Sequence, residues 1–182
     1  MDKIIFVTGN ERKIGEARLA CEPVGIEVVQ RKLDMDEIQS HDPIKVTEHK
    51  VRTAYELAGE PVVVGDTYWS IPALNGFPGA YMKDVAEWFS EDDFLTLVAN
   101  KADKRVSFTE NIAYYDGSEM KVFSKQYWGK FMRPSGVGNS IERVAAFNGQ
   151  TIGDRRVEGK FSHEADDFIW ADFVRWYLSR GK

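Results

Sequence analysis

The chain has 182 residues, a formal net charge of −5 and a pI near 5.3. Its length predicts a single domain over residues 1–182, and its acidic balance disfavours a protein that grips nucleic acid through a broad basic surface. Hydrophobic residues at 43% and charged residues at 29% are ordinary for a globular protein and disfavour disorder.

The chain opens with a predicted strand, a turn and the start of a helix. Ile4 to Val7 are four apolar residues of the kind found in buried strands, and Thr8-Gly9-Asn10 breaks the run. A helix N-terminus presents unpaired N–H groups and the positive end of the helix dipole, and Lys13 adds a cation. The turn is therefore either a phosphate cradle or an ordinary connection whose polar residues cap the helix, and the motif alone leaves both open.

A β-α-β unit is predicted next. Apolar residues recur at near-helical spacing over residues 11–22, and Pro23 and Gly25 end that helix. Ile26 to Val29 is a β-branched run that predicts a short strand beside the first one.

An acidic loop and a helix follow. Asp34, Asp36 and Glu37 lie within four positions, a density typical of a solvated loop but also suited to a hard cation with oxygen ligands. Residues 43–58 carry an apolar helical stripe. Lys50 lies near the middle of this helix, where a lysine is normally a surface residue and becomes a ligand group only if the helix borders a site.

A second buried strand is predicted at Val62 to Val64, with Gly65-Asp66-Thr67 at its end. Because ligands of open α/β sheets collect beyond the carboxyl ends of strands, we expect Thr8-Gly9-Asn10 and Asp66-Thr67 to face one site. Residues 68–83 contain Gly76 and Pro78-Gly79, which predict a compact turned loop.

The rest of the chain predicts helices around a hairpin. Residues 85–100 suggest two short helices, the second capped by Ser90. Residues 105–115 and 120–132 are predicted to pair as antiparallel strands around Asp116-Gly117, and residues 134–139 form a loop. Walker A and six-residue dinucleotide-binding sequences are absent from the chain, which disfavours kinase-like and Rossmann dehydrogenase functions.

A last helix is predicted to pack across the sheet. Ser162 would cap it. Its apolar side would carry Ala165, Phe168, Ile169, Phe173, Val174 and Tyr177.

The sequence also bears on the protein's surroundings. Cys21 is the single cysteine, which excludes an intramolecular disulfide and favours a reducing setting. The apolar runs are too short for a membrane span, and the N-terminus has a strand pattern where a signal peptide would have a basic and an apolar region. We therefore expect a cytoplasmic protein.

Three separated pieces of the chain match one known pattern in order and spacing. They are Phe6-Val7-Thr8-Gly9-Asn10 with Lys13, Leu33-Asp34 with Glu37, and Asp66-Thr67 leading to Ala73-Leu74-Asn75-Gly76-Phe77-Pro78-Gly79-Ala80-Tyr81. Over residues 3–83 the chain thereby resembles the inosine/xanthosine triphosphate pyrophosphatases, which remove aberrant purine nucleotides from the nucleotide pool.

The resemblance implies an α/β fold: an elongated central mixed β-sheet flanked by helices, with a small helical lobe, in a homodimer. It implies hydrolysis of a nucleoside triphosphate to a monophosphate and pyrophosphate with Mg²⁺, or alternatively Mn²⁺. Carried over by position, the triphosphate-binding residues would be Thr8, Gly9, Asn10, Lys13, Lys50 and Thr67, the metal ligands Glu37 and Asp66, and the catalytic residues Asp66 and Lys13. These residue types suit the reaction, because attack of water on phosphorus needs cations around the phosphates and a base that orients the water.

The first departure from the family pattern is Gly65. The family usually carries an acid immediately before the aspartate matched by Asp66, so one carboxylate is missing here from the metal and water network. We hypothesise that Asp34 or Asp36 substitutes in the outer shell of the metal. Unchanged Mg²⁺-dependent turnover after replacing both by asparagine would exclude this.

The second half departs further. The family's aromatic-Gly-aromatic-Asp-Pro stretch is missing, and its Ser-His-Arg triplet appears as Ser162-His163-Glu164, which turns a hydrogen-bond donor into an acceptor. The sequence therefore predicts an altered base pocket. Base-binding candidates are His163, which is alternatively a surface residue of a capping turn, and Lys160, with Arg143, Arg155 and Arg156 as further replacements.

Two classes of function remain open at the level of sequence. The first is an active nucleoside triphosphate pyrophosphatase with an altered base pocket, or a different phosphohydrolase on the same fold. The second is a catalytically impaired nucleotide-binding relative that acts as a sensor or interaction module, because Gly65 removes an acid.

Overall fold

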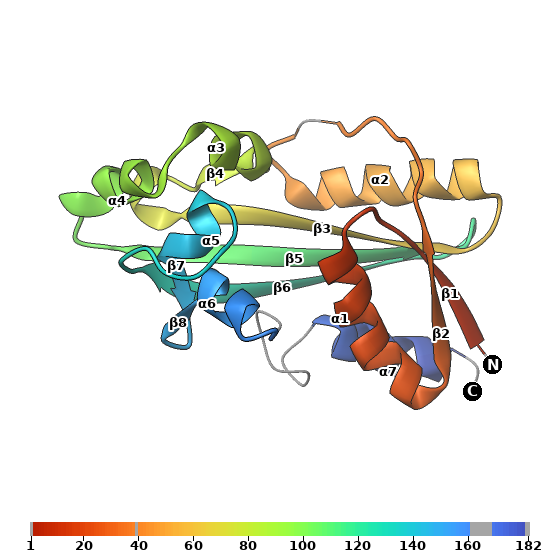
Figure 1. Cartoon of the computed structure of the whole chain (residues 1–182). Coiled ribbons are helices and arrows are strands. Elements are labelled where there is room, and N and C mark those ends of the chain that lie inside the picture. Colours follow the sequence, from red (N-terminus) through yellow and green to blue (C-terminus); the bar gives the residue numbers. More distant parts are fainter. Residues whose placement is uncertain (1, 39, 161–168, 181–182) are drawn as a thin grey trace. The chain divides into compact units, whose positions relative to one another are not determined.

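The computed structural model describes residues 2–38, 40–160 and 169–180 (Figure 1). The helices are α1 Glu11–Cys21, α2 Pro43–Ala58, α3 Met82–Trp88, α4 Glu91–Ala99, α5 Ser140–Val144, α6 Ile152–Val157 and α7 Ile169–Ser179, with 3₁₀ helices η1 Glu22–Val24 and η2 Pro72–Leu74. The strands are β1 Asp2–Val7, β2 Ile26–Arg31, β3 Val62–Ile71, β4 Phe77–Gly79, β5 Arg105–Tyr115, β6 Met120–Phe131, β7 Ala145–Phe147 and β8 Gln150–Thr151.

The strands form one mixed sheet in the order β2-β1-β3-β5-β6-β7-β8, with β4 paired to β3. Strand β1 is parallel to both β2 and β3, whereas β3–β4, β6–β7 and β7–β8 are antiparallel. The neighbours β5 and β6 are joined by a four-residue turn, a connection too short for a parallel crossover, so they also run antiparallel. The predicted α/β class with a central mixed sheet is confirmed.

The described chain divides into two compact units. The first comprises Met1–Asp66, Glu110–Lys125 and His163–Lys182, and the second comprises Thr67–Thr109 and Gln126–Ser162. Strands β3, β5 and β6 contribute residues to both units. The expectation of a single domain over residues 1–182 stays a prediction.

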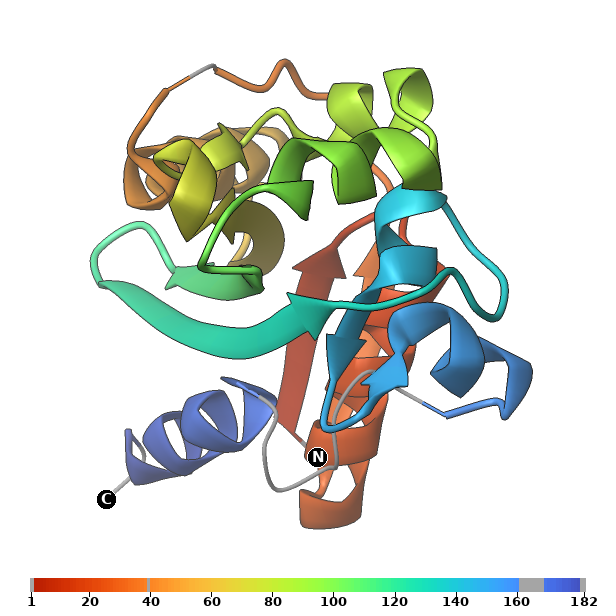
Figure 2. The same ribbon diagram turned by 90° about the vertical axis from the view of Figure 1, so that its left-hand side faces the viewer.

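In the first unit, helices cover both faces of the strands. Ile5 and Val7 of β1 lie in a buried cluster with Val51 of α2, whereas the ring of Phe6 faces the other way and meets Trp170 of α7 edge to face, 4.9 Å between centroids. This follows from the alternation of side chains along a strand. Figures 1 and 2 accordingly show α2 on one side of these strands and α7 on the other.

Helix α2 has the predicted bounds because its ends are marked in the sequence. Asp42 caps the N-terminus by accepting a hydrogen bond from the Ile44 N–H, and Pro43 occupies the first turn, where no N–H is needed. Gly59 ends the helix in the left-handed conformation that glycine adopts at low cost.

The second unit is built around an aromatic core. Trp69, Phe108 and Phe147 pack with ring centroids 4.9–6.0 Å apart, and α3 and α4 add Val85 and Phe94 to the same cluster. The two predicted helices in residues 85–100 are confirmed. Ser90 caps α4 as predicted, with a capping box completed by the Asp93 carboxylate.

Two predictions about β3 are wrong. Asp66 and Thr67 do not follow the strand but lie inside it, and the predicted loop over residues 68–83 contains the end of β3, β4 and the start of α3. The strand continues because Trp69 and Ile71 alternate into the aromatic core, and because Trp69 pairs with Gly79 of β4. Gly65 reads as a strand end in the sequence but is a buried strand residue.

The last helix is confirmed where it is described. Ile169, Phe173 and Val174 of α7 are buried, and the Phe173 ring contacts that of Phe123 on β6. Ser162, Ala165 and Phe168, expected to begin the helix, lie outside the described residues.

Candidate functional site

The turn between β1 and α1 caps the helix. The Oδ1 atom of Asn10 accepts hydrogen bonds from the backbone N–H groups of Arg12, at 3.0 Å, and Lys13, at 3.4 Å. The Asn10 N–H donates to the Oγ1 atom of Thr8 at 3.1 Å, and Gly9 and Asn10 are exposed. Asn10 therefore caps the helix, and the exposed helix N-terminus favours anions, so that phosphate binding by this turn stays a prediction.

Lys13 connects this turn to β3. Its ammonium group donates to the carbonyl oxygen of Gly65 at 3.0 Å, inside the first unit. Burial lowers the pKa of Lys13 from its ordinary 10.5 to about 8, against the opposing attraction of Asp66. The structure thus brings Lys13 and the Gly65-Asp66 pair together.

Asp66 faces the α2 side of the first unit. Val62 and Val64, at two-residue spacing before it, belong to the cluster against α2, and a β-carbon at position 65 would point instead at the Phe6 ring, 3.2 Å away. Because side chains alternate along the strand, the Asp66 carboxylate lies on the α2 side.

The acidic loop lies on the same side. Leu33 and Met35 pack against the buried cluster that contains Ile5, Val7 and Val51, called here the α2-side cluster. Asp34 and Asp36 alternate with them and are exposed. The loop thereby carries Glu37 to α2, where its carboxylate forms an ion pair with the ammonium of Lys50. The expected metal ligand and the expected phosphate-binding lysine therefore form an ion pair with each other.

The donor set fits a magnesium ion only together with a substrate. Among the described residues, groups of three or more His, Cys, Asp or Glu side chains that could hold a metal ion do not occur. Glu37 and Asp66 offer carboxylate oxygens, and Mg²⁺ is usually bound by one or two carboxylates with phosphate and water oxygens completing the octahedron. The residues present fit that pattern. The structure does not gather Asp34 or Asp36 with Asp66 into such a group.

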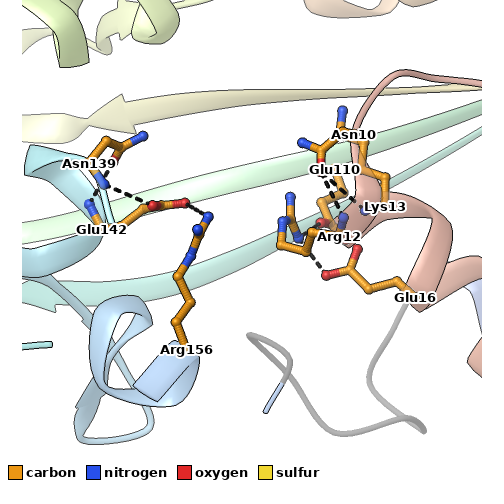
Figure 3. A network of polar contacts seen from close by, with 8 residues as sticks. All are labelled: Asn10, Arg12, Lys13, Glu16, Glu110, Asn139, Glu142 and Arg156. Atoms are coloured by element: carbon orange, nitrogen blue, oxygen red, sulfur yellow. Dashed lines mark hydrogen bonds and ion pairs between the residues drawn. The ribbon is translucent and has the colours of Figure 1, made fainter. Parts of the chain in front are cut away.

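A buried polar network at the start of α1 was not predicted (Figure 3). The Arg12 guanidinium forms ion pairs with Glu16, on the next helical turn, and with Glu110 of β5 at 3.6 Å. Both glutamates are buried, and burial raises the pKa of Glu16 to about 7, with Glu110 adding to the rise and Arg12 opposing it. The sequence signal that could have revealed this network is Glu110, a charged residue inside a strand of mostly buried residues.

A second missed residue is Asn111, the neighbour of Glu110. Its side chain is buried, and neither its amide nitrogen nor its oxygen has a hydrogen-bond partner in the described part of the chain. An asparagine inside a strand that is otherwise buried was the signal here too, because asparagine is depleted in strands.

The remaining candidates that the structure describes belong to the second unit. The Oγ1 atom of Thr67 is buried without a partner among the described residues. Lys160 is exposed and pairs with Glu158 at 2.8 Å, and Arg156 pairs with Glu142. Arg143 pairs with Glu91, Arg155 is buried, and His163 lies outside the described residues.

These features define an α/β protein with an exposed helix N-terminus, a half-buried lysine and a strand carboxylate in one unit. The chain belongs to the Ham1 family, whose model matches residues 4–140. The predicted resemblance is confirmed. Helices long and apolar enough to cross a membrane are not found in the described residues.

Relatives match over nearly the whole chain. A protein of Methanosarcina mazei named dITP/XTP pyrophosphatase is 32% identical and 98% of each chain is covered. A protein of Fusarium vanettenii named inosine triphosphate pyrophosphatase is 34% identical, with 90% of each covered. The fold is similar to that of a HAM1 protein from Coxiella burnetii, with a TM-score of 0.79 at 18% identity over 98% of this chain and 100% of the other.

Proposed function

We propose that the protein hydrolyses a nucleoside triphosphate to the monophosphate and pyrophosphate, with a non-standard or modified purine nucleotide as substrate. The observation that carries the proposal is the bond from the Lys13 ammonium to the Gly65 carbonyl, which holds a cation beside Asp66 at the N-terminus of α1. The names of the relatives, dITP/XTP and inosine triphosphate pyrophosphatase, support the substrate class.

The proposal assigns phosphate binding to residues of the β1–α1 turn and its surroundings. In this assignment the triphosphate-binding residues are Thr8, Gly9, Asn10, Lys13, Lys50 and Thr67. Helix N–H groups and ammonium groups stabilise the charge that develops on phosphate oxygens in the transition state. The low pKa of Lys13 supports this role, because the negative charge of a triphosphate would stabilise the ammonium group that burial disfavours.

Asp66 and Glu37 are the proposed metal ligands, and Asp66 also orients the attacking water and accepts its proton. Mg²⁺, or alternatively Mn²⁺, would when bound neutralise phosphate charge and lower the pKa of water. For Glu37 to take part, its ion pair with Lys50 must open, which frees Lys50 for the phosphates. That exchange is supported by the exposure of the Glu37 side chain, 52%.

The finer parts of the proposal rest on the sequence. They are a base pocket altered at Glu164, with His163 and Lys160 as base-binding residues, a single domain, a homodimer and a cytoplasmic location. The second candidate function, a catalytically impaired nucleotide-binding relative, is favoured by one observation: position 65 has no side chain.

The test is product identity. Incubated with Mg²⁺ and a panel of dITP, ITP, XTP and the standard nucleotides, the protein should release pyrophosphate and a monophosphate from at least one of them. We expect Asp66→Asn to lower turnover by about a thousandfold, since it removes the base and a metal ligand. Asp103→Asn, at a partly exposed acid of the second unit, is the control and should leave turnover unchanged.

Release of orthophosphate alone would contradict the proposal. Thermal stabilisation by Mg²⁺ and nucleotide without any product would favour the impaired relative, because a ligand that binds only the native state raises its stability. Gly65→Glu would then test whether the missing acid is the cause, with a side chain that starts toward the Phe6 ring, on the face of β3 opposite Asp66. Gly65→Ala controls for crowding against the Phe6 ring.

A further inference from the structure

The fold of the described residues does not explain why position 111 is an asparagine. It is 1% exposed, and both polar atoms of its carboxamide lack hydrogen-bond partners among the residues that the structure describes. Two other buried polar side chains of β5 are paired: Ser107 accepts from Gln126 and Glu110 pairs with Arg12. Burying an unpaired amide is costly, whereas an apolar residue of the same size would carry no such cost.

The alternation of β5 places Asn111 on the α2 side of the first unit. Ala113, two residues further on, lies in the α2-side cluster, and the ring of Tyr115 meets that of Tyr55 on α2 at 5.0 Å. Asp66 faces the same side by the same argument on β3. The two side chains therefore lie on one face of neighbouring strands.

The two strands are also in register to bring these residues close. A β-carbon at position 65 would lie 3.8 Å from the carbonyl oxygen of Asn111. Gly65 is the residue whose own carbonyl accepts from Lys13, and Asp66 follows it. The unpaired carboxamide thus belongs to the immediate surroundings of Asp66 and Lys13.

We propose that Asn111 is a binding residue for the hydrated Mg²⁺–triphosphate complex, an inference that rests on the proposed function. Its Nδ2 group would donate to a phosphate oxygen and its Oδ1 atom would accept from a water of the metal's shell, since a carboxamide offers both kinds of group without a charge. It can orient a water but not take its proton, which leaves proton transfer to Asp66.

This assignment predicts opposite effects on two measurements. Both amide atoms are covered, so the side chain or a neighbour must turn before a ligand reaches them. The amide has no partner among the described residues, which is destabilising, whereas the proposed ligand would pair it. A residue that only supported the fold would lower stability and binding together when replaced.

The test compares Asn111→Leu, of similar size, with the wild type and with Asn100→Leu, a control at the exposed end of α4. We expect Asn111→Leu to raise the unfolding temperature of the free protein by a few degrees, and Asn100→Leu to raise it by less. The stabilisation by Mg²⁺ with the α,β-methylene analogue of ITP should fall by half or more. The value of kcat/KM should fall about tenfold, as for a lost hydrogen bond.

An unchanged analogue-induced shift and an unchanged kcat/KM in Asn111→Leu would overturn the assignment, as would a parallel loss of stability and binding. If Asn111→Leu does not fold, Asn111→Ala must show the same loss of analogue-induced stabilisation. If the wild type neither binds the analogue nor hydrolyses any nucleotide, the proposed function fails as well. If the wild type and Asn100→Leu are active and Asn111→Leu equals them, only the assignment of Asn111 fails.

Discussion

Helices α1 and α5 begin in the same way and then differ at one position (Figure 3). Each is capped by an asparagine, Asn10 or Asn139, whose side chain accepts from the N–H three residues later. At α5 that third residue is Glu142, whose carboxylate accepts in return from the Asn139 N–H at 3.1 Å. At α1 it is Lys13, which cannot accept, and the Asn10 N–H donates to Thr8 instead.

The difference separates a helix start built for stability from one suited to binding. A carboxylate in the first turn is favoured by the helix dipole, and a cation there is disfavoured. Helix α5 has the favourable choice, and Arg156 further neutralises Glu142. Helix α1 also has an acid, Glu11, in its first turn, but two cations, Arg12 and Lys13, follow it. Arg12 is held by Glu16 and Glu110, while the Lys13 ammonium bonds a neutral carbonyl, so its charge is available to an anion.

The largest effect on activity should come from replacing Lys13, the residue at which the two helix starts differ. Lys13→Gln should lower kcat/KM by about 10²–10³, the usual loss for a group that stabilises transition-state charge. Because glutamine can accept from the Asn10 N–H as in a capping box, the free energy of unfolding should change little. Glu142→Gln at the equivalent position of α5 is the matched control and should leave turnover unchanged. Equal losses in both variants, measured by steady-state kinetics, would remove the distinction between the two helix starts.

The next effect concerns the two arginines of Figure 3. Arg12→Met leaves two buried glutamates facing each other and should lower the free energy of unfolding by about 3 kcal/mol, the low end for a broken buried ion pair, because Arg12 is partly exposed. Arg156→Met breaks a more exposed pair and should cost less than about 1 kcal/mol. Urea unfolding at pH 8 measures both. A smaller loss for Arg12→Met than for Arg156→Met would mean that the buried network does not stabilise α1.

The smallest effect is in the pH dependence. With a pKa of about 8, Lys13 loses its proton early in the free protein, so kcat/KM should fall above pH 8 by up to about tenfold per pH unit. Lys13→Arg should remove this fall, since a guanidinium keeps its charge. Stability should move the other way: between about pH 8 and 10.5 the unfolded chain holds the proton that the native chain has lost, so this residue's contribution rises with pH. A wild-type kcat/KM that stays constant up to pH 10 would contradict a Lys13 pKa of about 8, on which both expectations rest.

The sequence predicted those elements whose ends carry explicit signals. Helix α2 has Asp42, Pro43 and Gly59 at its ends, and the strands of the first β-α-β unit contain short runs of strand-forming apolar residues. The prediction failed at Gly65, which reads as a break because glycine is rare in strands, whereas packing of the Phe6 ring over position 65 explains why a side chain is disfavoured there.

The short elements between residues 140 and 157 were also missed. Periodicity cannot detect helices of five or six residues, although the capping boxes Asn139–Glu142 and Thr151–Asp154 are visible in the sequence.

The sequence predicted only part of the candidate site. Motif order placed Lys13 and Asp66 in one site, and the Lys13–Gly65 bond brings them together across 52 positions of sequence. The pairing of strands and their register decide which residues meet Arg12. They also decide that the Asn111 side chain has no hydrogen-bond partner among the described residues. Such long-range pairings are set by the whole sheet, and local sequence does not encode them.

The ion pair between Lys50 and Glu37 has a consequence for how the proposed ligands enter. Each partner blocks the other, since the lysine is assigned to the triphosphate and the glutamate to the metal. When one ligand draws its residue away, the other residue is released without further cost. Under the proposed function, Mg²⁺ and nucleotide should therefore bind with positive cooperativity, and by thermodynamic reciprocity each should tighten the other by the same factor.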